Sequence, residues 1–164
     1  VLCLELGPNR LGGLVSENEE IEMPYRTSVD RLKAYQEGST GAKLYITESS
    51  KNNPSEAELR TLELLKIYPQ ITGLLCMSDV LAGGAMQAAQ VLGKRIPEDL
   101  SVVGYDDLPS STTLNLTTVW QPTSQKGRQA GEILLALLQG ECTQSMSLPT
   151  RLRIRGSTAK PTGA

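Results

Sequence analysis

Residues 71–107, ITGLLCMSDVLAGGAMQAAQVLGKRIPEDLSVVGYDD, contain the pattern that decides the fold. An apolar run at 71–77 has the length of a buried strand, and a second such run follows at 100–105. The segment between them begins at Ser78 or Asp79, residue types that cap helices, and continues with small and apolar residues. Two strands joined by a helix over about thirty residues form a βαβ unit, in which the strands are parallel.

The alternation of strand and helix extends to both sides of this unit. The expected strands are residues 1–6, 43–47 and 150–156, and the expected helices are residues 26–37, a segment that begins at Ser55, and residues 124–139. Ser55 and Glu58 match a capping box, which satisfies free backbone donors at a helix start. The apolar face expected for that helix consists of Leu59, Leu62, Leu64 and Leu65. The buried stripe expected for the last helix consists of Ala130, Ile133, Leu134, Leu137 and Leu138. Loops are expected at 7–24 and 109–118.

This order of elements predicts an α/β fold, a doubly wound open parallel sheet with right-handed crossovers. The strand at 71–77 is apolar on both faces, as in sheets that helices cover on both sides. Gly83 and Gly84 lie inside the following helix, where each costs about 1 kcal/mol relative to alanine, so we expect a neighbouring backbone to approach closely there. In such sheets ligands bind beyond the carboxyl ends of the strands. The loops that follow the strands are therefore the expected binding site.

The composition excludes several functional classes. A net charge of −2 and a pI of about 5.3 argue against binding of nucleic acid by this chain itself. The sequence has no histidine, which excludes histidine-based triads and histidine-ligated metals. Its three cysteines, Cys3, Cys76 and Cys142, have no regular spacing, so we expect neither a disulfide framework nor a zinc site. This favours a location in the reducing cytoplasm. The apolar runs are too short to cross a bilayer. Because the sequence lacks both a signal peptide and an initiator methionine, we expect it to be part of a longer protein.

Polar residues follow the predicted strands where the binding site is expected. They are Glu48, Ser78, Asp79, Asp106 and Asp107. Two interpretations of the last pair stay open. In one, the carboxylates cap a turn or face solvent. In the other, which we favour, Asp106 accepts hydrogen bonds from a polyol or purine-like ligand and Asp107 has a structural role. Asp79 is better explained as a helix cap than as a ligand contact, and Ser78 fits both roles equally.

A magnesium site is a further interpretation of the same carboxylates, because acidic residues at strand ends bind Mg²⁺ in phosphoryl-transfer enzymes. Against it, the segment GPNRLGG at 7–13 lacks the Gly-Lys-Ser/Thr of a phosphate-binding loop and the G-x-G-x-x-G of a dinucleotide fold. An enzyme is therefore the least favoured interpretation. No catalytic residue, metal ligand or cofactor is predicted.

Three segments in order resemble the LacI/GalR family of bacterial transcription regulators. They are CMSDVLAGGAMQAAQVLGKRIPEDLSVVGYDDLP at 76–109, LTTVWQPTSQKGRQAGEILLALLQG at 116–140 and LPTRLRIRGST at 148–158. The resemblance is close over the second half of the chain and looser over the first. It implies a periplasmic-binding-protein-like fold, in which two α/β lobes close over a small effector while a separate helix-turn-helix binds DNA.

By this resemblance, residues 1–164 are an effector-binding domain, mainly its C-terminal lobe. The helix at about 124–139 is then expected to pack on an N-terminal lobe that this chain lacks, and the DNA-binding domain is also expected outside it. The implied function is effector sensing and dimerisation in a cytoplasmic LacI-type regulator. Its implied partners are a small sugar or nucleoside-like effector, a second copy of the chain, and operator DNA only through the helix-turn-helix; no membrane partner is expected. The helix at 80–92 and the loop at 110–115 are the implied dimer contacts.

The resemblance also assigns site residues. The family's effector-contacting aspartate falls on Asp106, the polar residue before its SD-type aspartate falls on Ser78, and an arginine falls on Arg31 in the segment RLKAY. The complete set of predicted ligand-binding residues is Arg31, Glu48, Ser78, Asp79 and Asp106. The loop after the second strand, ESSKNN at 48–53, lacks the aromatic residue that many family members stack on the effector, so the effector class stays open. A periplasmic sugar-binding transport receptor shares the fold and is the alternative function.

Overall fold

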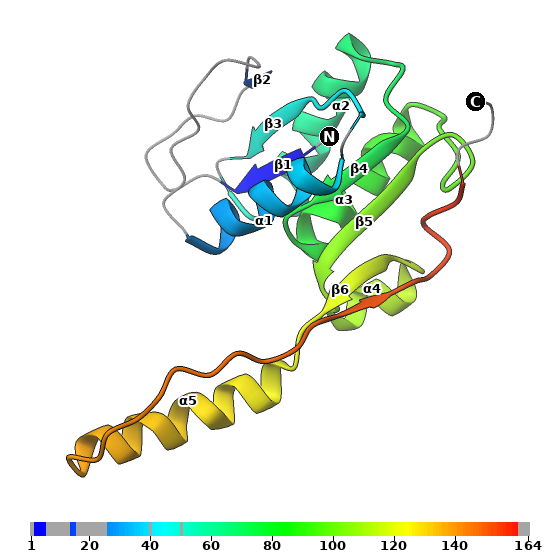
Figure 1. Cartoon of the computed structure of the whole chain (residues 1–164). Coiled ribbons are helices and arrows are strands. Elements are labelled where there is room, and N and C mark those ends of the chain that lie inside the picture. Colours follow the sequence, from blue (N-terminus) through cyan, green and yellow to red (C-terminus); the bar gives the residue numbers. More distant parts are fainter. Residues whose placement is uncertain (1, 6–13, 16–25, 40, 50, 161–164) are drawn as a thin grey trace.

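The computed structural model describes residues 2–5, 14–15, 26–39, 41–49 and 51–160 of the chain. They contain a seven-stranded sheet with the strand order β2-β3-β1-β4-β5-β6-β7 (Figure 1). The strands are β1 Leu2–Glu5, β2 Leu14–Val15, β3 Ile46–Ser49, β4 Gly73–Cys76, β5 Ser101–Asp106, β6 Thr117–Trp120 and β7 Arg151–Arg153. The helices are α1 Arg26–Gly38, α2 Pro54–Ile67, α3 Asp79–Val91, α4 Pro109–Thr113 and α5 Thr123–Leu138.

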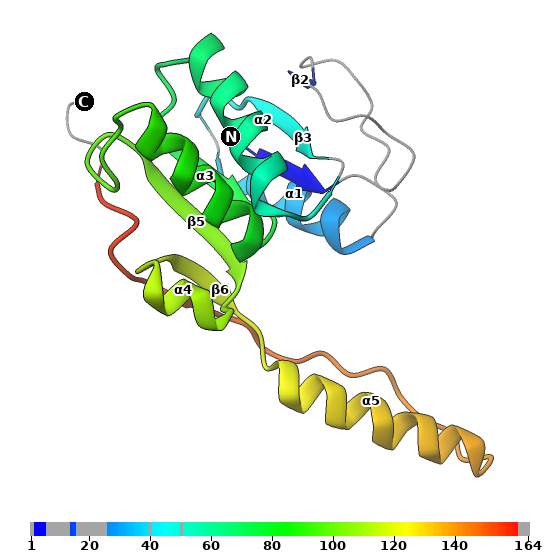
Figure 2. The same ribbon diagram turned by 180° about the vertical axis from the view of Figure 1, so that it is seen from behind.

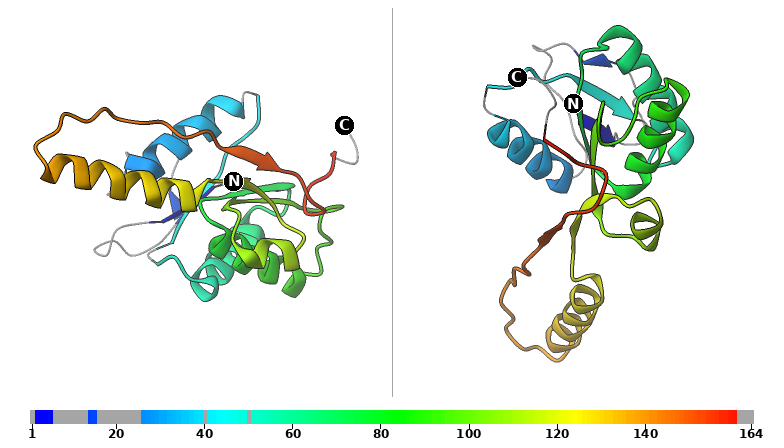
Figure 3. Two further views of the ribbon diagram at one scale, coloured as in Figure 1. Left: turned by 90° about the horizontal axis from the view of Figure 1, so that it is seen from below. Right: turned by 90° about the vertical axis from the view of Figure 1, so that its right-hand side faces the viewer.

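The sheet is parallel through its centre and antiparallel at both edges. β3, β1, β4, β5 and β6 pair in parallel, whereas β2 and β7 pair antiparallel with β3 and β6. Helix α1 covers one face, and α2 and α3 cover the other (Figures 2 and 3). This arrangement confirms the predicted α/β class with a mostly parallel sheet that helices flank on both sides.

The core lies between the sheet and the α2–α3 layer. Its fully buried side chains include Leu64, Leu65, Leu74, Met77, Leu81, Leu100, Val102 and Leu116. Gly84 of α3 explains how tightly the two helices pack. A Cβ atom at this position would meet the carbonyl oxygen of Pro54 and lie 2.8 Å from Cβ of Ala57. The close approach expected from the two glycines is therefore confirmed at Gly84, whereas Gly83 has room for a methyl group, 3.7 Å from a Leu114 methyl.

The start and the buried face of α2 differ from the prediction. Asn53, not Ser55, caps the helix, because its Oδ1 accepts a hydrogen bond of 2.9 Å from the Glu56 backbone N–H. Pro54 then occupies the first turn, where its missing N–H costs nothing. The buried side chains are Ala57, Thr61, Leu64 and Leu65, whereas Leu59 is 50% exposed. The contact with Gly84 of α3 places Ala57 inward, which turns Leu59 outward.

Two segments expected as loops contain regular structure. The 109–118 segment forms α4 and the start of β6. Within the expected loop at 7–24, Leu14–Val15 forms β2, and residues 7–13 and 16–24 lie outside the described residues.

Helix α5 extends away from the sheet, and the chain after it returns to the sheet to form β7 (Figure 1). None of its residues is buried; Leu134 is 57% exposed and Leu138 is 76% exposed. The stripe predicted to be buried is exposed, and no element within the described residues covers it; the packing partner expected for this helix lies outside this chain. None of the helices in the described ranges combines the length and apolarity that crossing a membrane requires.

Candidate functional site

Side chains from α1, from the loops after β3 and β4, and from the end of β5 surround a hollow of about 300 Å³ at the carboxyl edge of the sheet. It is lined by Thr27, Ser28, Arg31, Asn52, Met77, Ser78 and Asp106. Three of the five predicted ligand residues, Arg31, Ser78 and Asp106, thus line one cavity. We refer to it as the rim cleft.

Arg31 is held in the rim cleft by two contacts. Its Nη1 donates a 2.5 Å hydrogen bond to the Met77 carbonyl oxygen, and its guanidinium carbon lies 3.6 Å from the centroid of the Tyr105 ring. A guanidinium stacked on a ring and bonded to backbone has little freedom to reorient. The cleft therefore contains a fixed positive charge with further N–H donors.

Asp106 faces this charge. Its Oδ1 lies 3.8 Å from Nη2 of Arg31 and accepts a 2.6 Å hydrogen bond from Nε2 of Gln121. Within the described ranges, Oδ2 has no hydrogen-bond donor, and the side chain is 30% exposed. The carboxylate is thus oriented from one side and keeps an acceptor for another molecule.

The backbone around Asp106 is strained. Its φ is 112° and that of Asp107 is 56°, both in the region that favours glycine. Strain of this kind persists only where the surrounding structure fixes it, and it occurs most often at ligand sites.

Burial raises the pKa of the Asp106 carboxyl above its ordinary value. The Arg31 charge and the Gln121 hydrogen bond oppose this effect, Asp79 adds to it, and Lys126 opposes it. Behind the cleft, burial also raises the pKa of Tyr35, whose hydroxyl donates to the Cys76 carbonyl oxygen at 3.5 Å. The ionised Asp106 carboxylate is therefore poorly solvated at the rim cleft.

Asp107 points into a different set of contacts. Its Oδ1 lies 2.7 Å from Nη2 of Arg155 and its Oδ2 lies 3.2 Å from Nε of Arg153. The side chain is only 11% exposed, and both arginines belong to the segment that returns through β7. These ion pairs fit the structural role favoured for Asp107, since they join the end of β5 to the returning chain.

Asp79 is buried and bound entirely within the protein. Its oxygens accept hydrogen bonds from the Leu108 N–H at 2.8 Å and from the hydroxyls of Ser111 and Thr118, both at 2.5 Å. Gly104 on β5 allows this, because a Cβ there would meet Oδ1 of Asp79. Asp79 thereby connects α3 with α4, β6 and the loop that follows Asp106. It lines the hollow beside α3 rather than the rim cleft.

Ser78 has the cap role predicted for it and also lies at the rim cleft, where its predicted ligand contact stays a prediction. Its Oγ accepts the Leu81 N–H at 3.2 Å and so caps α3, and it donates to Oδ1 of Asn52 at 2.7 Å at the wall of the cleft. Glu48, near the end of β3, is 5% exposed and is not among the described residues that line the cleft.

Gln121 was not predicted as a site residue. Its signal was present in the sequence, because it directly follows β6 at the carboxyl edge where Asp106 ends β5. It was missed because residues 117–120 were not recognised as a strand. Among the described residues, no three His, Cys, Asp or Glu side chains are grouped as a metal ion would require.

Comparison with known proteins shows a consistent set of similarities. The model of the periplasmic binding protein-like domain matches residues 2–158. The chain is 38% identical over 117 residues to the ribose operon repressor of Halalkalibacterium halodurans. The aligned residues cover 69% of this chain and 35% of the repressor. The crystal structure of a LacI-family transcriptional regulator from Corynebacterium glutamicum superposes with a TM-score of 0.85 and 30% identity, over 96% of this chain and 48% of that one. A LacI-family regulator from Arthrobacter sp. FB24, in complex with lactose, gives a TM-score of 0.73 and 26% identity, over 96% and 57%. The chain spans about a third of the repressor and about half of the two structures.

Proposed function

Because the chain belongs to the periplasmic binding protein-like domain family, as a LacI/GalR-type effector-binding domain, we propose that it binds a small polar effector at the rim cleft of a transcription regulator. The observation that carries this proposal is the pairing of Arg31 with Asp106 across the cleft. A fixed cation and an oriented carboxylate together offer donors and an acceptor to the hydroxyl groups of a sugar. The similar proteins are regulators rather than transport receptors, which favours regulation over transport.

The effector class follows from the same groups. Within the described ranges, the rim cleft presents hydroxyl, amide, guanidinium and carboxylate groups, and the ring of Tyr105 lies under Arg31. One relative is a ribose operon repressor and another regulator is in complex with lactose. A sugar is therefore the first candidate. A nucleoside, whose ribose keeps every hydroxyl except the anomeric one, is the second.

The rim cleft of this chain provides half of the proposed effector site. We assign residues 1–164 mainly to the C-terminal lobe of a two-lobed domain, with the apolar face of α5 packing on the N-terminal lobe. The exposed Leu134, Leu137 and Leu138 support this assignment, because apolar faces of this size are normally covered. An effector that contacts both lobes stabilises the closed arrangement by its differential affinity for it. Closure then changes operator affinity through a helix-turn-helix outside this chain, in the cytoplasm.

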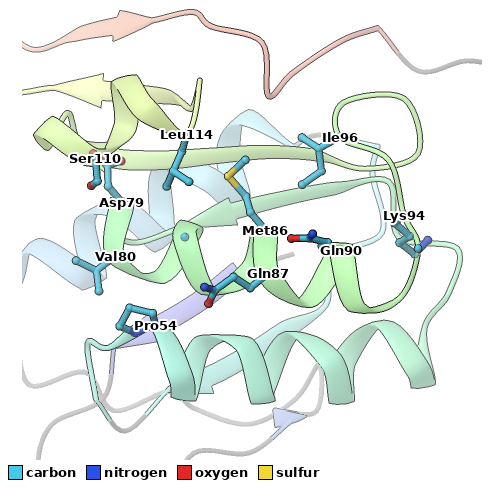
Figure 4. Close-up of a pocket in the computed structure, with 12 residues that line it drawn as sticks. Pro54, Asp79, Val80, Met86, Gln87, Gln90, Lys94, Ile96, Ser110 and Leu114 are labelled. Atoms are coloured by element: carbon cyan, nitrogen blue, oxygen red, sulfur yellow. The ribbon is translucent and has the colours of Figure 1, made fainter.

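A homodimer is the second part of the proposal. Helix α3 and the segment after α4 border a hollow of about 710 Å³, shown in Figure 4. Val80, Met86 and Leu114 line it, and the neighbouring Val91 is 66% exposed. This surface coincides with the dimer contacts implied by the sequence resemblance at 80–92 and 110–115. Substitution of Val91 by glutamate is expected to shift the intact regulator towards monomer in light scattering, and an unchanged mass would exclude α3 from the interface.

The proposed function is tested by a thermal-shift screen on the intact regulator with D-ribose, lactose and cytidine. At least one compound is expected to raise the melting temperature of the wild type and not that of Asp106→Ala. Asp99→Ala is the control, since Asp99 pairs with Arg95 and is not among the described residues that line the rim cleft. A compound that stabilises the wild type and Asp106→Ala equally would contradict the assignment of the site.

A further inference from the structure

We propose that Gln121 is a positioning residue that orients Asp106 for its ligand and connects the rim cleft to the linker before α5. This inference rests on the proposed function of the cleft. It adds the residue that follows β6 to a site otherwise built from α1, from the chain after β3 and β4, and from the last residue of β5.

The contact itself is short and specific. Nε2 of Gln121 donates to Oδ1 of Asp106 at 2.6 Å, and Oδ1 is also the oxygen that lies 3.8 Å from Nη2 of Arg31. One hydrogen-bond donor and one cation thus face the same oxygen, which leaves Oδ2 as the acceptor without a donor in the described ranges. A carboxylate rotates freely about its last bond unless one oxygen is held. Gln121 therefore decides where Oδ2 points.

Asp106 also forms part of the wall between two hollows. It lines the rim cleft, and it lines a second hollow of about 520 Å³ that is bordered by residues 106–109 and 120–125. We call the second one the linker hollow. Gln121 lines the linker hollow and reaches Asp106 from that side. The ligand would approach the carboxylate from the other side, so both groups can contact it at once.

The position of Gln121 gives this contact a second consequence. Only Pro122 separates it from α5, the helix that projects from the lobe (Figure 1). Asp106 is the last residue of the parallel strand β5, and its Cα is paired with that of Trp120. A change in the direction in which the chain leaves β6 moves the Gln121 donor relative to Asp106. The orientation of the ligand-binding carboxylate is thereby tied to the orientation of α5.

A carbon-detected NMR titration of the Asp106 carboxyl group in this chain tests the contact without any ligand. The variant Gln121→Met keeps the length of the side chain and removes the donor. Its Asp106 pKa is expected to rise by about one unit, because a hydrogen bond to a charged acceptor favours the ionised form. Gln125→Met is the matched control, as Gln125 lines the same linker hollow without a bond to Asp106 and should leave that pKa unchanged. The other charges near the carboxyl, Arg31, Asp79 and Lys126, are the same in all three proteins. An Asp106 pKa that is equal in Gln121→Met and wild type would overturn the proposal.

A second measurement separates this inference from the proposed function. For whichever of D-ribose, lactose or cytidine binds the intact regulator, calorimetry is expected to show about tenfold weaker binding to Gln121→Met and unchanged binding to Gln125→Met. Equal affinity of Gln121→Met and wild type would show that Gln121 does not position the acceptor. Failure of all three compounds to bind the wild type would count against the proposed function, whereas the NMR result would still decide whether Gln121 orients Asp106.

Discussion

The guanidinium group of Arg31 lies on the ring of Tyr105, with 3.6 Å between the guanidinium carbon and the ring centroid. This stacking joins α1 to β5 at the end of the strand that carries Asp106. Because the ring lies under the cation, the charge is held in place while its remaining donors face the rim cleft.

Arg31→Lys is expected to weaken effector binding by at least about tenfold, although it keeps the positive charge. Lysine cannot stack as a plane or donate to the Met77 carbonyl and to a ligand from fixed directions. Calorimetry on the intact regulator measures the effect. Arg26→Lys on the same helix is the control. Because the Arg26 side chain is 93% exposed, this change should leave effector affinity unaltered. Equal affinities of Arg31→Lys and wild type would show that charge alone suffices.

The two adjacent glycines of α3 should respond in opposite directions to alanine. Gly84→Ala is expected to lower the free energy of unfolding by about 1–3 kcal/mol, because the added methyl group meets the backbone of α2. Gly83→Ala is expected to raise it by up to about 1 kcal/mol, since alanine favours the helix and the methyl group has room. Urea unfolding of the two variants provides the comparison. Destabilisation of the same size in both would contradict the packing described for α2 and α3.

Asp79→Ala is expected to reduce the free energy of unfolding by about 3 kcal/mol or more. The change leaves the Leu108 N–H and the hydroxyls of Ser111 and Thr118 without their buried acceptor. Urea unfolding measures the loss. Asp30→Ala, at an ion pair whose carboxylate side chain is 69% exposed, should have a much smaller effect. A loss at Asp79 no larger than that at Asp30 would be incompatible with a network that fixes the loop after Asp106.

The raised pKa of Asp106 gives a signed dependence of stability on pH. Burial makes the folded protein bind the Asp106 proton more tightly than the unfolded chain does, so the ionised carboxylate lowers stability as pH rises through the folded pKa. The neutral variant Asp106→Asn avoids this cost. Its melting temperature is therefore expected to exceed that of the wild type at pH 7, and the difference should shrink as the pH falls below the folded pKa. A difference that grows on acidification would mean that the pKa is lowered, not raised.

The fold could be predicted largely from local patterns. The apolar runs at 71–77 and 100–105, separated by one capped helix, allow few arrangements other than neighbouring parallel strands. Asn53 was missed as the cap of α2 because Ser55 and Glu58 match a capping box, whereas the choice between caps depends on where Pro54 enters the helix. For α5 the apolar stripe predicted a buried face, and only the family resemblance placed the packing partner outside this chain, because a sequence pattern does not state whether a partner is present.

The site, like the fold, was predicted only in part. The rule that ligands bind beyond parallel strands brought Ser78 and Asp106 together, and the family resemblance supplied Arg31. The rule does not distinguish side chains that face the cleft from those turned into the protein. Asp79 and Asp106 both lie at strand ends, yet three donors of the protein surround the first and an open cleft adjoins the second. That difference arises from contacts with α4 and β6, which lie far from Asp79 in the sequence.

Effector binding by Arg31 and Asp106 is tested most directly by a crystal structure of the intact regulator with the compound that stabilises it in the thermal-shift screen. We expect a hydroxyl group of that compound within about 3 Å of Oδ2 of Asp106, with Arg31 donating to a second oxygen. A compound bound elsewhere, or one whose density leaves both side chains without contact, would contradict it.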